Sequence, residues 1–155
     1  MSILIPGGGN SYEFEYLIHK GFTNVYLLDI SSQPIENIKQ RLPQIDDSML
    51  ICGDFFQHQG QYDLIIEQTF FCALDPAYRT NYVQQMYSLL KPAGKLAGVL
   101  FNRQFSFDGP PFGGDKTEYE KLFSDLFFIK TMELCYNSVL PRSGTELFIE
   151  FITRK

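Results

Sequence analysis

The chain has 155 residues, of which 45% are hydrophobic and 20% are charged, and its formal net charge is -5. This is an ordinary globular composition, and the apolar content argues against a disordered chain. The acidic balance argues against a nucleic-acid backbone or an anionic membrane as a partner. No apolar stretch approaches the roughly 20 residues that a membrane span needs.

The chain opens with a strand, a glycine turn and a helix. Residues 2–5 are a short apolar run that meets Pro6 and three glycines, which predicts a buried strand ending in a turn. Apolar residues at helical spacing then predict a helix over residues 11–20. Gly21 is the residue expected to end it.

Three further strands are predicted before the middle of the chain. Residues 24–30 form the second strand, which ends in an acid and is followed by a helix that Ser31 or Ser32 caps. The third and fourth strands are predicted over residues 48–52 and 62–67. Both are short apolar runs bounded by polar or glycine residues.

The second half of the chain alternates in the same way. A helix is predicted over residues 75–90, then a fifth strand over residues 95–101. Residues 105–115 are rich in Gly and Pro and must form a loop. A last helix is predicted over residues 116–124.

Two alternating, β-rich segments close the chain. Residues 127–136 and 146–153 are predicted to pair as a hairpin around a turn at residues 141–144. Strands that alternate with helices imply a parallel sheet with right-handed crossovers. We therefore expect an α/β fold with a doubly wound, mostly parallel seven-stranded sheet and an antiparallel C-terminal hairpin, in a single domain over residues 1–155.

Ligands of an open parallel sheet bind at the carboxyl ends of its strands, and the first candidate group there is the glycine turn. Glycines let the backbone approach a ligand closely, and the helix start that follows offers unpaired N–H groups to an anion. The turn comprises Pro6, Gly7, Gly8, Gly9 and Asn10. A plain tight turn is the alternative.

Acids follow the next two strands. Asp29, which lies 22 residues after Gly7 and precedes Ile30, can accept hydrogen bonds from both hydroxyls of a ribose. A helix N-cap is the alternative role. Asp54 can accept from the exocyclic amine of adenine while Phe55 packs on the ring, although an Asx turn with core aromatics explains the pair equally well.

A fourth group, residues 67–74, follows the fourth strand and borders the same cleft. It places an acid (Glu67), an amide (Gln68) and the hydroxyl of residue 69 before two aromatics, Phe70 and Phe71. No side chain in the sequence is required as a catalytic acid or base. The three cysteines form no CxxC pair, so we expect no metal site, and free thiols indicate a reducing compartment, hence the cytoplasm.

In chain order, these features resemble class I S-adenosylmethionine-dependent methyltransferases. Within that class the chain is similar to the group related to thiopurine methyltransferase, which includes thiol, halide and thiocyanate methyltransferases. The more specific matches are a Thr-Phe-Phe-Cys-Ala run at residues 69–73 and a Gly-Pro-Pro-Phe loop at residues 109–112.

The resemblance implies a role for each group. The turn at residues 7–9 would hold the methionine part of S-adenosylmethionine, Asp29 its ribose, and Asp54 its adenine. Glu67 and Gln68 would border the methionine side and the transfer centre. The acceptor pocket would be walled by Phe70, Phe71 and a loop that includes Pro111 and Phe112.

Two departures from that group are visible. The group typically carries Asp-Tyr where this chain has Glu67 and Gln68. It also has an N-terminal segment that closes over cofactor and acceptor, and we expect this lid to be short or absent here.

The predicted function is methyl transfer from S-adenosylmethionine, with S-adenosylhomocysteine as product, to a small molecule such as a thiol, a halide or a thiopurine-like compound. We expect a monomer or a weak homodimer. One alternative is a degenerate methyltransferase fold that binds a ligand or partner without turnover. The other is an NAD-binding oxidoreductase, which the absence of the third glycine of Gly-x-Gly-x-x-Gly disfavours.

Overall fold

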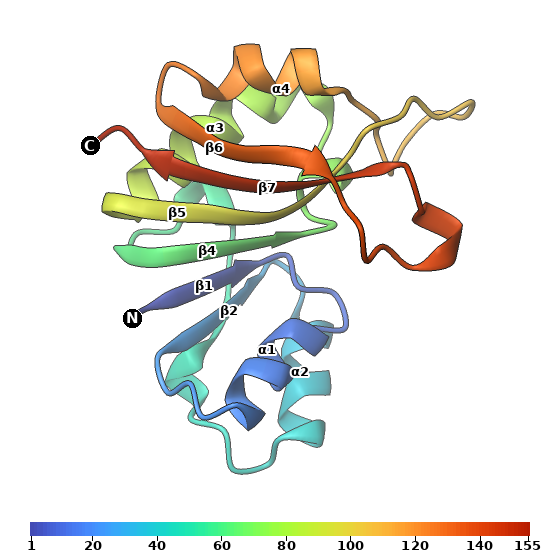
Figure 1. Cartoon of the computed structure of the whole chain (residues 1–155). Coiled ribbons are helices and arrows are strands. Elements are labelled where there is room, and N and C mark those ends of the chain that lie inside the picture. Colours follow the sequence, from blue (N-terminus) through green and yellow to red (C-terminus); the bar gives the residue numbers. More distant parts are fainter.

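The computed structural model describes residues 1–155 and contains a seven-stranded sheet with the strand order β3-β2-β1-β4-β5-β7-β6 (Figure 1). The strands are β1 (Ile3–Pro6), β2 (Val25–Asp29), β3 (Leu50–Cys52), β4 (Tyr62–Gln68), β5 (Leu90–Phe101), β6 (Phe127–Leu134) and β7 (Glu146–Thr153). The first five are parallel, whereas β7 lies between β5 and β6 and is antiparallel to both. The predicted α/β fold with an antiparallel C-terminal hairpin is confirmed.

Four helices flank this sheet. They are α1 (Tyr12–His19), α2 (Ser32–Arg41), α3 (Arg79–Leu89) and α4 (Lys116–Phe123). In Figure 1, α1 and α2 lie on one face beside β2, and α3 and α4 lie on the other. Single-turn 3-10 helices occupy Asp47–Met49, Phe55–Gln57, Phe71–Ala73, Pro76–Tyr78 and Leu140–Arg142.

The alternation of side chains along β1 and β2 builds a core on each face. Leu4 and Leu28 belong to the larger cluster, under α3 and α4, whereas Ile3 and Leu27 belong to the smaller cluster, under α1 and α2. All four residues of β1 are buried, as expected for a central parallel strand that is covered on both sides.

Local signals set most helix ends where the sequence predicts them. The side chain of Ser31 accepts a hydrogen bond from the backbone N–H of Gln33 and caps α2. Gly21 follows α1 with φ of +90°, a conformation that favours glycine.

Four predicted boundaries are wrong. The predicted helix over 75–90 is split, since Asp75 caps a 3-10 turn before α3 begins. The third strand starts only at Leu50, because the preceding residues form a 3-10 turn capped by Asp46. The fifth strand begins five residues early, at Leu90, which pairs with Tyr62. The sixth ends at Leu134.

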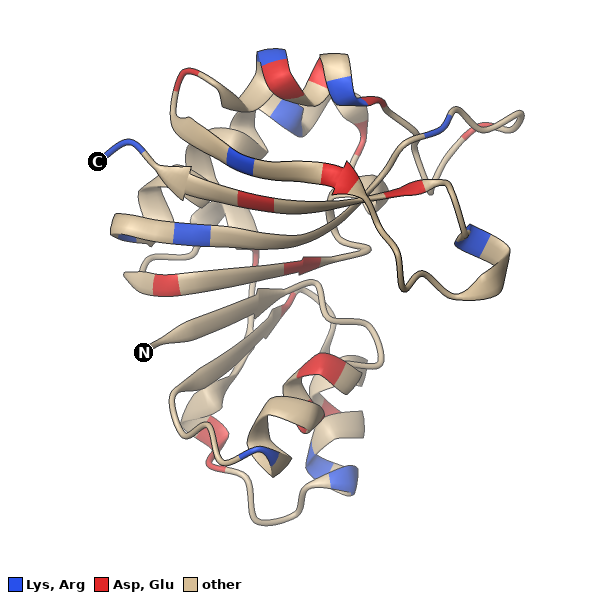
Figure 2. Ribbon diagram, viewed as in Figure 1, with Lys and Arg blue, Asp and Glu red and all other residues tan.

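Lys and Arg positions are interspersed with Asp and Glu positions along the ribbon in Figure 2, and several of these residues pair across the sheet. Lys95 of β5 and Lys130 of β6 both contact the carboxylate of Glu150 on β7, at N···O distances of 2.9 and 3.1 Å. No helix of the structure has the length and apolarity needed to cross a membrane.

Candidate functional site

The carboxyl ends of β1, β2, β3 and β4 surround a cleft of about 580 Å³. It lies at the switch point, where successive strands diverge to the two sides of β1 and where open α/β sheets bind ligands. The lining residues are Gly7, Gly9, Leu28, Asp29, Ile30, Gly53, Asp54, Phe55, Phe56, Thr69, Phe70, Ala73, Leu74, Asp75 and Tyr78. The four predicted groups therefore contribute residues to one cavity.

The glycine turn forms the first edge of the cleft. Gly7 and Gly9 have φ of +62° and +54°, which side chains other than glycine rarely adopt. A β-carbon on Gly9 would meet nothing within 4 Å, so this part of the turn is open. Ser11, which precedes α1, makes no side-chain cap, and the first N–H groups of the helix are left for another partner.

The other three residues predicted for this turn do not line the cleft. Pro6 is buried at the end of β1. Gly8 packs against Leu27, where a β-carbon would lie 2.6 Å from Cδ1. Asn10 is exposed, and its carbonyl accepts a hydrogen bond from the guanidinium of Arg41.

Asp29 ends β2 at the middle of the cleft. Its Oδ1 accepts a hydrogen bond of 2.9 Å from the backbone N–H of Ser31, which leaves Oδ2 without a protein partner. Ile30, the next residue, is 75% exposed and lies on the same wall. The arrangement offers a free carboxylate oxygen beside an apolar side chain, which suits a sugar that carries a flat base.

Aromatic side chains form another wall of the cleft. Asp54 accepts a hydrogen bond of 2.9 Å from the N–H of Phe56 and so starts the 3-10 turn Phe55–Gln57. The ring of Phe55 packs edge-on against Phe56 and Phe70, at centroid distances of 5.3 and 5.0 Å. The proposed Asx turn and the cleft position of Asp54 are thus both present.

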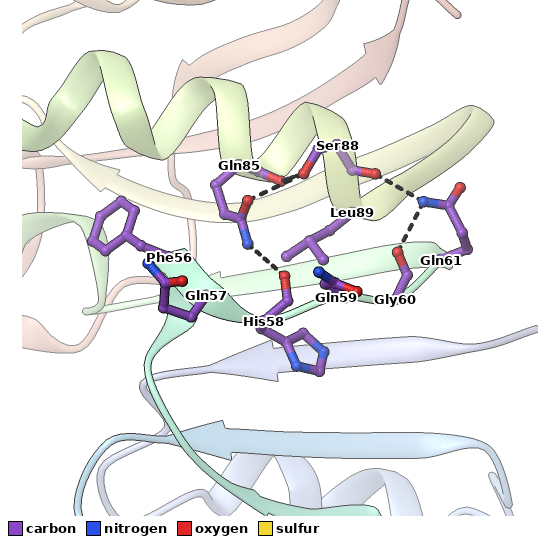
Figure 3. A pocket seen from close by; sticks show the side chains of 9 residues that line it. All are labelled: Phe56, Gln57, His58, Gln59, Gly60, Gln61, Gln85, Ser88 and Leu89. Atoms are coloured by element: carbon purple, nitrogen blue, oxygen red, sulfur yellow. Dashed lines mark hydrogen bonds between the residues drawn. The ribbon is translucent and has the colours of Figure 1, made fainter.

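The aromatic turn is held from behind by Gln85 of α3 (Figure 3). Its Nε2 donates to the carbonyl of Phe55 at 2.7 Å and to that of His58 at 2.9 Å. Figure 3 shows Gln85 and His58 among the residues that line a second, polar cavity of about 340 Å³. His58 lines this second cavity rather than the cleft, and burial lowers the pKa of its imidazole.

Glu67 and Gln68 are not among the residues that line the cleft. The Glu67 carboxylate is buried, with Oε1 accepting from the N–H groups of Phe70 and Phe71 and Oε2 accepting from the hydroxyl of Tyr82. Burial raises its pKa to about 7. The alternation along the strand indicates that Glu67 is buried, because it lies two positions after the buried Ile65 and shares its face.

The residues predicted to wall an acceptor pocket lie in three different places in the structure. Phe70 lines the cleft, whereas Phe71 is buried in the core under the guanidinium of Arg79, 4.7 Å from its ring centroid. Pro111 and Phe112 line a separate cavity of about 610 Å³ beside the start of α3. The N–H of Phe112 donates to the carbonyl of Cys72 at 2.7 Å and ties the two regions together.

Some lining residues were missed by sequence reasoning. Thr69, Ala73 and Leu74 belong to the segment predicted to border the cleft after the fourth strand, but Asp75 and Tyr78, which also line the cleft, were not predicted. Their position after a strand end was the available signal. No cluster of three or more His, Cys, Asp or Glu side chains has the geometry to hold a metal ion.

Comparison with protein families gives one match over nearly the whole chain. The family model described as thiopurine S-methyltransferase matches residues 1–149. A probable thiol methyltransferase 2 from Arabidopsis thaliana is 33% identical over 150 residues, covering 92% of this chain and 66% of that protein. For thiocyanate methyltransferase 1 from the same plant, the identity is 34% over 149 residues, covering 92% of this chain and 65% of that protein. The chain spans just under two thirds of the length of these relatives.

Solved structures support the same architecture. A SAM-dependent methyltransferase from Methanosarcina mazei superposes with a TM-score of 0.79 at 17% identity, covering 98% of this chain and 92% of the other. The N-methyltransferase NodS from Bradyrhizobium japonicum, solved with S-adenosyl-L-homocysteine, gives a TM-score of 0.75 at 14% identity, covering 99% and 79%. At these identities the likeness establishes the fold.

Proposed function

The chain belongs to the thiopurine S-methyltransferase family, and we propose that it transfers a methyl group from S-adenosylmethionine to a small-molecule acceptor, releasing S-adenosylhomocysteine. One observation carries the proposal. The glycine turn, Asp29 and Asp54, which follow three successive strands, line a single cleft. The family match also favours this function over an NAD-dependent oxidoreductase.

The residues present fit the cofactor. In the proposal, the turn at Gly9 and the uncapped start of α1 bind the methionine carboxylate, because both offer N–H groups, whereas the N–H of Gly7 donates to the carbonyl of Leu28. Asp29 binds the ribose through its unpartnered Oδ2, with Ile30 beside it. Asp54 receives the adenine amine and Phe55 supports the ring.

The other predicted site residues keep a supporting role in this proposal. None of them lines the cleft, and we propose no direct contact between them and the cofactor. These residues are Pro6, Gly8, Asn10, Glu67, Gln68, Phe71, Pro111 and Phe112.

The bound cofactor would supply an activated methyl group, so the protein's task is chiefly alignment. The cleft side chains set the direction of approach, and the aromatic wall of Phe55, Phe56 and Phe70 excludes water from it. No catalytic residue is assigned. A soft nucleophile such as a thiolate or a halide needs no strong general base.

The proposed acceptor is a thiol, a halide or a thiopurine-like compound. Support comes from the names of the relatives, which are thiol, thiocyanate and thiopurine methyltransferases. We further propose that residues 1–155 form a single domain that acts in the cytoplasm as a monomer or a weak homodimer.

Calorimetry with S-adenosylmethionine, S-adenosylhomocysteine and NAD tests the cleft. We expect binding of the first two and none of NAD. A transfer assay against thiols, iodide and thiopurines then tests turnover. Cofactor binding without transfer to any acceptor would favour a degenerate fold that binds without turnover. Absence of binding by either adenosyl compound would contradict the proposal.

A further inference from the structure

A buried carboxylate joins three parts of the molecule behind the cleft. Glu67, at the end of β4, is 1% exposed. Its Oε1 accepts from the N–H of Phe70 at 2.8 Å and from the N–H of Phe71 at 3.0 Å. Its Oε2 accepts from the hydroxyl of Tyr82 on α3. The carboxylate therefore connects the strand, the turn that follows it and the helix that covers both.

The turn held in this way is one wall of the cleft. Thr69, Phe70, Ala73 and Leu74 all line the cavity. Thr69 has φ of +60°, a left-handed conformation that costs a non-glycine residue about 1 kcal/mol or more. Such a residue keeps that conformation only where its surroundings fix it, and the two hydrogen bonds to Glu67 begin at the very next residue.

The surroundings of Glu67 contain no positive charge paired with its carboxylate. No lysine or arginine forms an ion pair with it, and the titratable groups that face it are Tyr82, Cys72 and Glu146. An unpaired buried carboxylate is expensive, and an apolar residue of similar size would be easier to bury. The hydrogen bonds from the three donors offset this cost. Two of the donors, the N–H groups of Phe70 and Phe71, belong to the turn that forms one wall of the cleft.

We infer that Glu67 is a positioning residue, which fixes the Thr69–Leu74 turn and thereby holds the ring of Phe70 in place over the glycine turn of the cleft. The effect on the cofactor rests on the function proposed for that cleft. Glu67 acts through the turn and need not touch the cofactor. The feature that matters is an oxygen that accepts both N–H bonds, more than the negative charge itself.

Three variants separate these properties. Glu67→Leu keeps the volume but removes both acceptor oxygens, and Glu67→Gln keeps one oxygen that can accept both N–H groups. Asp63→Ala is the matched control, since Asp63 lies on the same strand but its carboxylate binds Ser2 and Lys91. The probe is S-adenosylhomocysteine, because its sulfur is uncharged and a direct attraction between the Glu67 carboxylate and a sulfonium is thereby excluded.

We expect Glu67→Leu to weaken binding of S-adenosylhomocysteine roughly tenfold or more, as lost hydrogen bonds of this kind do. Glu67→Gln should recover most of the affinity, and Asp63→Ala should change it less than about twofold. Equal affinities for Glu67→Leu and the wild type would overturn the inference. So would an equal loss in Glu67→Leu and Glu67→Gln, which would make the charge the important property.

Amide hydrogen exchange tests the positioning without any cofactor. In the wild type, the amides of Phe70 and Phe71 should be protected although they begin an irregular turn, and Glu67→Leu should speed their exchange at least tenfold while Glu67→Gln does not. Unprotected amides in the wild type would overturn the inference even if no variant folds. Protected amides in a protein that does not bind the probe would instead count against the function proposed for the cleft.

Discussion

The ring of Phe70 lies directly against Gly7. A β-carbon on Gly7 would come within 2.2 Å of Cδ1 of that ring, far inside van der Waals contact. The contact joins the turn after β1 to the turn after β4, which are neighbouring strands in the sheet. The two edges of the cleft therefore depend on each other, and a change at one should be felt at the other.

Gly7→Ala should lower both stability and cofactor affinity. Residue 7 has φ of +62°, so a side chain adds backbone strain to the clash with Phe70, and the two together should cost about 2–4 kcal/mol of unfolding free energy. Urea unfolding and calorimetry with S-adenosylhomocysteine measure the two effects. Gly21→Ala is the control, because Gly21 has φ of +90° but no neighbour within 4 Å of a β-carbon. Equal destabilisation by both variants would show that the contact with Phe70 is unimportant.

Asp29→Ala should weaken binding of S-adenosylmethionine by roughly 1–3 kcal/mol, the value of lost charge-assisted hydrogen bonds. Asp29→Asn should lose less, because its oxygen can keep the bond from the Ser31 N–H while its amide group can still hydrogen-bond a ribose hydroxyl. The matched control is Asp47→Ala, which removes an exposed acid paired with Lys39. Isothermal titration provides the measurement. Unchanged affinity for Asp29→Ala would place the ribose elsewhere.

The order of strands and helices along the chain and the place of the cleft were open to prediction, because both follow from local patterns. A strand that ends in Asp29 puts that acid at the carboxyl edge of any parallel sheet. The position of Phe112 outside the cleft could not be predicted. It depends on a hydrogen bond between its N–H and the carbonyl of Cys72, 40 residues away, and nothing local specifies that pairing.

Glu67 and Thr69 illustrate a second limit. Alternation along β4 indicates that Glu67 faces the interior, but the three donors that meet it come from a turn and a helix whose positions only the folded chain defines. The left-handed backbone of Thr69 has no signature in its residue type, since threonine disfavours that conformation. Interior partners and strained turns are therefore the parts of the site that sequence patterns leave open.

Gln85→Leu should weaken cofactor binding from a distance. The substitution removes the two hydrogen bonds that hold the carbonyls of Phe55 and His58, at about 0.5–1.5 kcal/mol each in stability. The aromatic turn should then move more freely, and affinity for S-adenosylhomocysteine should fall about threefold to tenfold. Gln61→Leu is the control, since Gln61 lines the same polar cavity but binds Gly60 and Ser88 instead. A similar loss in both variants would contradict a specific role for Gln85.

The pKa values of two carboxylates on β4 are shifted in opposite directions. Hydrogen bonds from Ser2, together with one from Lys91, lower the pKa of Asp63 to about 2. Its contribution to stability is therefore present above about pH 4 and is lost as the pH falls toward 2. Burial instead raises the pKa of Glu67 from its ordinary value of 4.5 to about 7. The folded state then holds the proton more tightly than the unfolded state, so stability should fall as the pH rises from about 4.5 to 7.

Urea unfolding of the wild type and of Glu67→Gln over a range of pH isolates this effect. Relative to the variant, the wild type should lose about 3 kcal/mol of unfolding free energy between pH 4 and pH 8, the equivalent of a pKa raised from 4.5 to about 7. The loss should level off above pH 7, where Glu67 is ionised in both states. Asp63→Asn should give a difference of opposite slope, confined to pH below about 4. Parallel stability curves for the wild type and Glu67→Gln would contradict this prediction. They would mean that the Glu67 carboxylate ionises as easily in the folded protein as in water, although it is buried in the structure.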